Sequence, residues 1–242
     1  LSPSRTAAQR AIESGRVSWQ GPQGREVVAK PAQLLAPNAQ LFVETDEADR
    51  YVSRGGLKLA GALAHSRIDV SGMHCLDVGQ STGGFSDCLL QAGATHVLGL
   101  DVGHQQLHRK LREDARITCI EGINARSIDR VALSEHYPAD GFDLIVADLS
   151  FISLTKVLAQ LPPLLKADGQ MLLLVKPQFE VGADNLGKGG IVRDPALYAV
   201  VEADLRQAAC NCGLTVVDWF DSPITGGDGN REFFMWTRHE SH

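Results

Sequence analysis

The glycine-rich segment 77–85, Asp-Val-Gly-Gln-Ser-Thr-Gly-Gly-Phe, has the composition of a loop that holds a small ligand. Gly79, Gly83 and Gly84 allow the backbone to turn tightly and to approach a ligand closely. A short apolar stretch precedes this Gly-rich loop, and apolar residues at helical spacing follow it. A strand, a glycine-rich turn and a helix N-terminus together form the ligand crevice of a doubly wound α/β sheet.

The spacing of these glycines and one acidic residue indicate which ligand the loop holds. The pattern Gly-x-x-x-Gly-Gly differs from the Gly-x-Gly-x-x-Gly of pyrophosphate-binding loops, and no Lys-Ser or Lys-Thr pair follows it as in a P-loop. Asp101 ends the next apolar segment, about 20 residues further on, where a carboxylate can accept hydrogen bonds from ribose hydroxyls. This order of features favours S-adenosylmethionine over a dinucleotide, and leaves a dinucleotide-dependent oxidoreductase as a remote alternative.

Four charged residues from distant parts of the chain form a second candidate group. They stand at the ends of predicted strands or helices: Lys58, Asp148, Lys176 and Glu232. A charged side chain that abuts a buried strand is costly to desolvate unless it is paired or used. Each of the four by itself is most often a solvated or salt-bridged residue. If the fold gathers them at one crevice, the lysines and carboxylates can offset one another's charge.

The elements that must position these residues follow from the hydrophobic periodicity. Strands are predicted at 74–78, 96–101, 116–120, 142–147, 170–176, 214–219 and 232–238. Helices are predicted at 55–65, 84–92, 104–113, 127–135, 153–166 and 194–211, the last with Asp194 as N-cap and Pro195 in its first turn. This alternation predicts an α/β fold, a doubly wound and largely parallel sheet with helices on both faces.

Residues 1–45 are predicted to form a separate small α+β domain, which the polar linker 46–54 joins to residues 55–242. Ser4 is the expected N-cap of a helix that Gly15 ends, and short strands follow at 16–19, 27–28 and 41–43. The net charge is −6 for the whole chain, which argues mildly against nucleic-acid binding. The first 45 residues, however, carry five basic and three acidic side chains, so this part is locally positive.

Composition limits the class of protein. A hydrophobic content of 44% and a charged content of 21% are ordinary for a globular protein, and the longest apolar run, 171–175, is far too short to cross a bilayer. Five scattered cysteines indicate reduced thiols in a cytoplasmic protein. No metal site is expected, because Cys210 and Cys212 lack the spacing of a zinc site, and His104 and His108 have no third ligand nearby.

Several runs of the sequence resemble known families. The pattern Ser-Arg-x-x-Ala-x-x-x-Ile-x-x-Gly-x-Val at 4–17 is similar to the S-four-type RNA-binding domain, with the first helix of that domain cut short at residue 1. From Tyr51 onward the chain resembles the FtsJ-type ribose 2′-O-methyltransferases, and the whole chain resembles the TlyA family, which joins these two parts. The shared runs lie at 51–56, 77–85, 147–153, 175–181, 189–195 and 229–234.

The resemblance implies a class I S-adenosylmethionine-dependent methyltransferase fold with seven strands, S-adenosylmethionine as cofactor, and ribosomal RNA or ribosomal subunits as partner. It implies a catalytic tetrad of Lys58, Asp148, Lys176 and Glu232, and no metal. The implied donor-binding residues are Asp77, Gly79, Ser81, Thr82, Gly83, Gly84, Phe85, Asp101, Asn124 and Asp148. The expected RNA-binding residues are Arg5, Arg10, Arg16, Lys188 and Arg193.

Methyl transfer to a ribose hydroxyl requires that this oxygen lie in line with the sulfonium methyl and lose its proton. Lys176 is the candidate base, and it must be neutral to act; a nearby Lys58 and partial burial would disfavour its charged form. Asp148 is expected to orient the lysines, and Glu232 to hold the second lysine.

The segment 178–193 is long and rich in glycine, and it is predicted to be a mobile cover that orders on RNA binding. Phe85, Phe151 and Phe179 are candidates for stacking on an unstacked base, although core packing is the commoner fate of each.

Two alternative functions remain. Proteins of the TlyA family have also been labelled haemolysins, which would make this a secreted, membrane-active protein; the lack of an apolar span and the cysteine pattern oppose this. An RNA-binding protein with an inactive methyltransferase domain is the other alternative, and the intact set of four charged residues opposes it.

Overall fold

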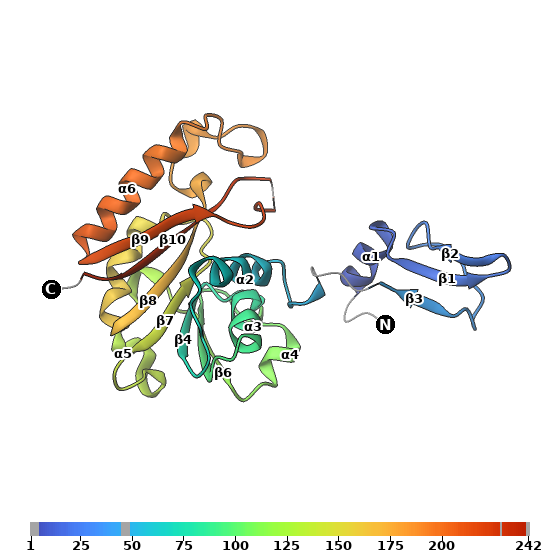
Figure 1. Cartoon of the computed structure of the whole chain (residues 1–242), viewed down its shortest axis with the longest axis horizontal. Helices are drawn as coiled ribbons and strands as arrows, with labels where there is room; N and C mark the ends of the chain where they lie inside the picture. Colours follow the sequence, from blue (N-terminus) through green and yellow to red (C-terminus); the bar gives the residue numbers. More distant parts are fainter. Residues whose placement is uncertain (1–4, 45–48, 228, 241–242) are drawn as a thin grey trace. The chain divides into compact units, whose positions relative to one another are not determined.

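A computed structural model describes residues 5–44, 49–227 and 229–240 of the chain. The chain forms two compact units, residues 1–50 and 51–242 (Figure 1). Each unit has its own hydrophobic core. Ser4, the expected N-cap of the first helix, and positions 46–48 of the expected linker lie outside the described residues.

The first unit consists of one helix and a three-stranded antiparallel sheet with the strand order β2-β1-β3. Its elements are α1 (Arg5–Glu13), β1 (Val17–Gly21), β2 (Gly24–Val27) and β3 (Leu41–Val43). Gly15 has a φ of +73° and its amide donates to the carbonyl of Ile12, so the predicted glycine stop is confirmed. Ala11, Val17 and Val28 form the buried core, which is small because the unit is small.

The second unit contains a seven-stranded sheet with the order β6-β5-β4-β7-β8-β10-β9 (Figure 1). Its strands are β4 (His74–Val78), β5 (His96–Asp101), β6 (Ile117–Glu121), β7 (Phe142–Ala147), β8 (Leu165–Val175), β9 (Leu214–Asp221) and β10 (Phe233–His239). Neighbouring strands are parallel except for β10, which runs antiparallel to both β8 and β9. The predicted seven-stranded, mostly parallel sheet is confirmed.

The helices of this unit agree only in part with the predictions. Its α-helices are α2 (Gly55–Ser66), α3 (Gly84–Gln91), α4 (Arg109–Arg112), α5 (Arg130–Leu133) and α6 (Leu197–Asn211). The helices predicted at 104–113 and 127–135 are reduced to the single turns of α4 and α5. The helix predicted at 153–166 is wrong: three short 3-10 turns, Leu154–Lys156, Leu158–Gln160 and Pro162–Leu164, replace it. Pro162 and Pro163 donate no backbone hydrogen bond, so a regular α-helix cannot continue through the end of this segment.

The predicted start of the last helix is displaced by a turn. Asp194 accepts a hydrogen bond from the amide of Ala196 at 2.9 Å, and the regular helix α6 begins one residue later at Leu197. Asp194 therefore supports the turn that leads into the helix rather than capping the helix itself.

Apolar side chains of the central strands alternate between two covered faces. Leu144 and Leu172 belong to the apolar cluster that includes residues of α2 and α3. Their chain neighbours Ile145 and Leu173 belong to a second cluster, which includes residues of α6 and of the 3-10 turns. Because successive side chains of a strand point to opposite faces, two separate cores hold the sheet rigid from both sides. The loops at the carboxyl ends of the strands are thereby fixed in position.

Candidate active site

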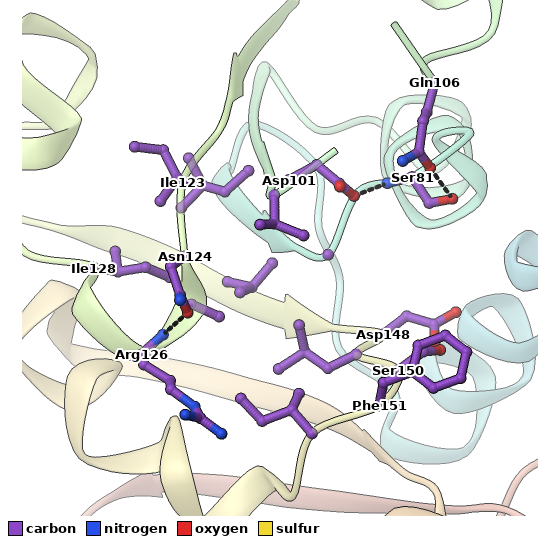
Figure 2. A pocket seen from close by; sticks show the side chains of 17 residues that line it. Ser81, Asp101, Gln106, Ile123, Asn124, Arg126, Ile128, Asp148, Ser150 and Phe151 are labelled. Atoms are coloured by element: carbon purple, nitrogen blue, oxygen red, sulfur yellow. Dashed lines mark hydrogen bonds between the residues drawn. The ribbon is translucent and has the colours of Figure 1, made fainter. Parts of the chain in front are cut away.

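Three adjoining cavities lie at the carboxyl ends of the parallel strands. The first has a volume of about 520 Å³ and has Asp101 in its wall (Figure 2). The second, of about 320 Å³, is lined in part by Lys58, and the third, of about 380 Å³, by Glu232. Ser150 lines all three cavities, so they are parts of one crevice. This is the edge at which open α/β sheets bind ligands.

The glycines of the Gly-rich loop are required by close contacts with neighbouring segments. Gly79 has a φ of +86°, and a Cβ there would lie 2.7 Å from the carbonyl oxygen of Asp148. At Gly84, the first residue of α3, a Cβ would collide with the hydroxyl of Ser53. Because these glycines have no side chain, the loop can pack closely against Asp148 and against Ser53. Other residues of the loop line the first two cavities.

Asp101 and Asn124 line the first cavity together with residues of the Gly-rich loop (Figure 2). One carboxylate oxygen of Asp101 accepts a hydrogen bond from the amide of Ser81, and the other accepts one from the amide of Gly103, each at 2.7 Å. Each oxygen keeps a second lone pair with which to accept from a ligand. The sequence pointed to a ribose contact for Asp101, but missed that the same carboxylate holds the Gly-rich loop in place.

Asp77 lies beneath the Gly-rich loop and is fully buried. It accepts a hydrogen bond from the Ser86 hydroxyl at 2.7 Å, and this hydroxyl accepts one from the side-chain amide of Gln80, also at 2.7 Å. Burial raises the pKa of Asp77 to about 7, because a charged carboxylate is poorly solvated there. The Gln80 side chain is turned under the loop, against Gly99, which has no Cβ to obstruct it.

Most of the residues expected to bind the donor line the first two cavities. The first is lined by Gly79, Ser81, Asp101, Asn124 and Asp148 among others. The second shares several of these residues and adds Thr82, Gly84 and Phe85. Asp77 and Gly83 line neither of the two, and they support the loop from beneath and within.

The four charged residues of the expected tetrad come together as two ion pairs. Lys58 on α2 pairs with Glu232, which precedes β10, and these side chains are only 8% and 2% exposed. Lys176, at the end of β8, pairs with Asp148 at 2.6 Å and donates a hydrogen bond to the Ser150 hydroxyl at 2.8 Å. Each lysine therefore has its own carboxylate partner. Both lysines line the second and the third cavity.

Two aromatic side chains stand at the third cavity. Phe151 is 90% exposed, and its ring centroid lies 5.2 Å from that of Phe179. Phe85, the third residue considered for base stacking, is instead buried and stacks on Phe234 in the core.

The segment 178–193, the cover segment, is anchored to its surroundings. Leu186 and Val192 form an isolated β-bridge within it. The buried side chain of Asn230 donates to the carbonyl of Gly190 at 3.0 Å and accepts from the amide of Val192 at 3.2 Å. The segment is thus held by side-chain and backbone bonds, and it forms part of the wall of the third cavity. Its predicted mobility stays a prediction.

The cover segment is also tied to the loop that follows β7. Glu180 accepts hydrogen bonds from the Ser153 hydroxyl at 2.6 Å and from the amide of Leu154 at 2.8 Å. Sequence reasoning assigned no role to Ser150, Glu180 or Asn230, although all three stand within the runs that carry the family resemblance. Their contacts join segments that are distant in sequence, so no local sequence pattern could have predicted them.

Those residues expected to bind RNA whose side chains the structure describes line none of the three cavities. Arg5 is exposed on α1, and Arg16 is held by an ion pair with Asp49 within the first unit. The side chain of Arg10 lies outside the described residues. Lys188 and Arg193 are exposed on the cover segment.

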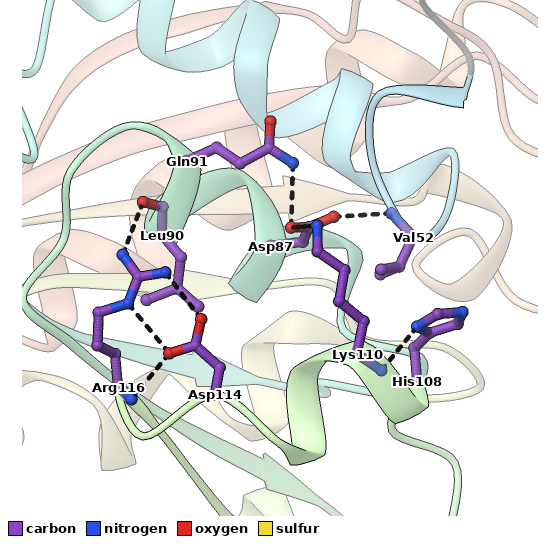
Figure 3. Close-up of polar contacts among 8 residues, drawn as sticks. All are labelled: Val52, Asp87, Leu90, Gln91, His108, Lys110, Asp114 and Arg116. Atoms are coloured by element: carbon purple, nitrogen blue, oxygen red, sulfur yellow. Dashed lines mark hydrogen bonds and ion pairs between the residues drawn. The ribbon is translucent and has the colours of Figure 1, made fainter. Parts of the chain in front are cut away.

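A buried carboxylate fixes the chain where the second unit begins (Figure 3). Asp87 on α3 accepts hydrogen bonds from the amide of Val52 at 2.8 Å and from the side chain of Gln91 at 3.0 Å. Lys110 adds an ion pair at 3.3 Å. These bonds fasten the segment that carries Ser53, and Ser53 lines the second cavity.

Within residues 5–44, 49–227 and 229–240, no cluster of three or more histidine, cysteine or acidic side chains is arranged to hold a metal ion. His104 instead lies 3.4 Å from Glu121, and the ring of His108 accepts from the amide of Lys110. None of the described helices has the length and apolar character needed to span a membrane.

Comparison with known proteins agrees with this geometry. The profile of the FtsJ-like methyltransferases matches residues 51–239. The 16S/23S rRNA (cytidine-2′-O)-methyltransferase TlyA of Mycobacterium tuberculosis is 42% identical over 241 residues, which cover 100% of this chain and 87% of that protein. Hemolysin A of Brachyspira hyodysenteriae is 41% identical over 191 residues, covering 79% and 78%. A solved structure from Streptococcus thermophilus with a provisional hemolysin name has 38% identity and a TM-score of 0.78, covering 98% of this chain and 84% of that one. The chain belongs to the TlyA family of FtsJ-like methyltransferases.

Proposed function

We propose that this protein methylates a ribose 2′-hydroxyl of ribosomal RNA, at a cytidine as the name of the tuberculosis relative states. The observation that carries this proposal is the meeting of two lysine–carboxylate pairs with the Gly-rich loop in one crevice. Membership of the family indicates that the reaction is methyl transfer. The four side chains include groups that can accept the proton of a hydroxyl and stabilise the charge that results.

S-adenosylmethionine is the cofactor that family membership implies, and the first two cavities fit it. Asp101 offers free lone pairs for ribose hydroxyls, and the exposed Asn124 side chain lines the same cavity. The Gly-rich loop leads from there to the second cavity, where Thr82 and Gly84 would hold the methionine portion. When bound, the cofactor supplies an electrophilic methyl group on a sulfonium.

Lys176 is the proposed base. Its Nζ lies between Asp148 and the Ser150 hydroxyl, at the junction of the second and third cavities. In the neutral form it would accept the proton of the ribose hydroxyl as attack proceeds. Asp148 would then stabilise the ammonium that results, while the paired Lys58 and Glu232 fix the opposite wall. Most of the acceleration would come from holding the hydroxyl in line with the methyl group.

The third cavity is proposed to admit the target nucleotide. Phe151 presents an exposed aromatic face at its mouth, and Phe179 supports that ring. A base that has left its stack regains stacking energy on such a face. Lys188 and Arg193 on the cover segment would contact the flanking phosphates.

The first unit is proposed to be an S-four-type RNA anchor within residues 1–45, with 46–54 as the linker. Arg5, Arg10 and Arg16 would contact phosphates there, and the positive charge of this part supports the assignment. Because ribosomal subunits are the proposed partner, we place the activity in the cytoplasm.

The decisive experiment is transfer of labelled methyl from S-adenosylmethionine to ribosomal subunits, followed by nuclease digestion and analysis of the labelled nucleotides. Label in a 2′-O-methylated cytidine is expected. Label in a base, or in protein, would refute the proposal. Donor binding without transfer to any ribosomal subunit would favour the inactive RNA-binding alternative instead.

A further inference from the structure

The loop 148–153, which follows β7 and which we call the β7 loop, carries side chains of every cavity wall. Asp148 and Ser150 contact Lys176, and Phe151 stands at the third cavity. The position of this loop therefore sets the distance between the proposed base and the face on which a target base would stack.

The backbone of the β7 loop is strained at Phe151. This residue has a φ of +64°, in the left-handed region that bulky side chains rarely adopt. Its side chain is exposed, so burial of the ring does not compensate for the strain. Such a conformation persists only where the surrounding structure imposes it. Besides the ring contact with Phe179, the contacts that impose it therefore lie on either side of Phe151.

The near end of the loop is fixed by the sheet. The amide of Asp148 donates to the carbonyl of Val78 at 3.1 Å, which ties the loop to the end of β4. Lys176 adds its contacts to Asp148 and Ser150. All these contacts lie before Phe151, so they cannot by themselves hold the residues that follow it.

At the far end, one carboxylate joins the β7 loop to the cover segment, beside the local bonds of the Ser153 hydroxyl with Thr155. Glu180 accepts from the Ser153 hydroxyl at 2.6 Å and from the amide of Leu154 at 2.8 Å, and Leu154 is itself anchored in the core. Glu180 stands in the turn directly after Lys176 and Pro177, and its own amide donates to the carbonyl of Pro177 at 2.9 Å. The short turn that follows the proposed base, Lys176, therefore also carries the side chain that binds the far end of the β7 loop.

We propose that Glu180 is a positioning residue for the acceptor RNA, which holds the β7 loop in the strained conformation that presents Phe151 to the target nucleotide. This inference rests on the proposed function, because it concerns binding of the same RNA. Glu180 lines none of the three cavities and acts through Ser153 and Leu154.

The two hydrogen bonds that Glu180 accepts, from Ser153 and Leu154, form a clamp on the β7 loop. A substitution can test whether this clamp needs the charge of the carboxylate or only its hydrogen bonds. Partial burial raises the pKa of Glu180, while the bonds from Leu154 and Ser153 oppose that shift. Both partners are donors to the carboxylate, and the Ser153 hydroxyl can also accept. A glutamine can therefore accept from Leu154 with its oxygen and donate to Ser153 with its nitrogen. Glu180→Gln should preserve the clamp, and Glu180→Ala should remove it.

The test compares steady-state methylation of ribosomal subunits by the full chain and its variants, together with calorimetric binding of S-adenosylmethionine. Glu180→Ala is expected to raise KM for RNA about 10-fold or more, the effect of losing hydrogen bonds to a charged group, with kcat falling by less. Donor affinity should stay within about twofold, because no donor-cavity contact changes. Glu180→Gln should behave like the wild type, and Ser153→Ala should show a smaller effect in the same direction.

Two further variants make the role of Phe151 explicit. Phe151→Ala should raise KM for RNA, and adding Glu180→Ala to it should raise KM little further, because both changes remove the same presented ring. Glu202→Ala is the matched control, since Glu202 bonds only to Arg206 on α6 in the contacts described. It should leave both constants unchanged.

Each other outcome overturns the inference. Unchanged KM in Glu180→Ala would show that the clamp is not needed, and a fall in kcat alone would make Glu180 part of the proton transfer. Additive effects with Phe151→Ala would show that it acts elsewhere. If Glu180→Ala does not fold, the decision passes to Ser153→Ala, whose unchanged KM would refute the proposal. A wild-type protein that methylates no ribosomal RNA would instead refute the proposed function, while donor affinity stays measurable.

Discussion

The first cavity and the third cavity are built in different ways. The first is formed by the Gly-rich loop and by the ends of neighbouring strands, and backbone amides make its main hydrogen bonds, as in the two that Asp101 accepts. The third is held by side chains from distant segments: Lys58 meets Glu232 across 174 positions, and Asn230 meets Val192 across 38. Loss of a side chain should therefore affect the two sides differently.

At the first cavity, the loss of a side chain weakens a contact in a frame that backbone hydrogen bonds maintain. At the third cavity, the loss of a side chain leaves a buried charge without its partner, and this costs more than the pair itself contributes to stability. The comparison predicts that substitutions around the third cavity are more damaging than those around the first.

Lys176→Ala should reduce methyl transfer by about 10²–10⁴-fold, the usual loss when a general base is removed. Binding of S-adenosylmethionine should stay close to normal, because the role of Lys176 lies in the transition state. Lys176→Arg should fare no better, since a guanidinium stays protonated. Single-turnover rates on ribosomal subunits check this. An arginine variant with most of the activity would mean that position 176 acts only through its charge.

Lys58→Met should lower the free energy of unfolding by about 3–5 kcal/mol, because Glu232 is left buried without its partner. Adding Glu232→Gln should restore most of the loss. The exposed pair of Arg109 and Glu113 provides the control, and Arg109→Met should cost about 0.3–0.5 kcal/mol. Urea unfolding of the four proteins measures the difference, and equal costs at the two sites would contradict it.

Asp101→Ala should weaken binding of S-adenosylmethionine by about 1–3 kcal/mol, the cost of a lost acceptor together with a loosened Gly-rich loop. Asp101 also accepts hydrogen bonds from the amides of Ser81 and Gly103, so part of the lost affinity should come from a less ordered Gly-rich loop. Calorimetry with the wild type as reference measures this. Unchanged affinity would place the ribose elsewhere in the first cavity.

Deletion of residues 1–45 should leave donor binding unchanged and weaken RNA binding. If three arginines each contact a phosphate, the slope of log affinity against log salt should become shallower by about 2. Filter binding of ribosomal RNA over a range of salt concentrations checks this. A truncated protein with the same affinity and slope would show that the first unit is no RNA anchor.

The buried Asp77 should make stability depend on pH. Its pKa in the folded protein is raised to about 7, above an ordinary value of about 3.9, so the folded state binds this proton more tightly. The contribution to the free energy of unfolding is complete near pH 4 and is lost as the pH rises towards 7. Asp77→Asn should remove this dependence, and its stability relative to the wild type should therefore increase between pH 4 and pH 7. Urea unfolding in that range would contradict it if both proteins showed the same slope.

The elements most faithfully predicted are those whose pattern is local. All seven strands of the large sheet were predicted, because each contains a short run of apolar or β-favouring residues bounded by turn residues. The helix predicted at 153–166 was wrong although its apolar spacing suited one; Pro162 and Pro163 exclude a regular α-helix only at the end of that segment. Propensity is a weak guide where a few backbone restrictions decide the conformation.

The sequence by itself determined the Gly-rich loop, the order in which strands and candidate site residues follow one another along the chain, and the identity of the four charged residues. Only the tertiary structure decided that Lys58 pairs with Glu232 and Lys176 with Asp148, that Gln80 turns inward against Gly99, and that Glu180 clamps the β7 loop. The physical reason is range. Glycine turns and apolar periodicity act over a few residues, whereas ion pairs and clamps depend on which segments the packed sheet brings to one edge.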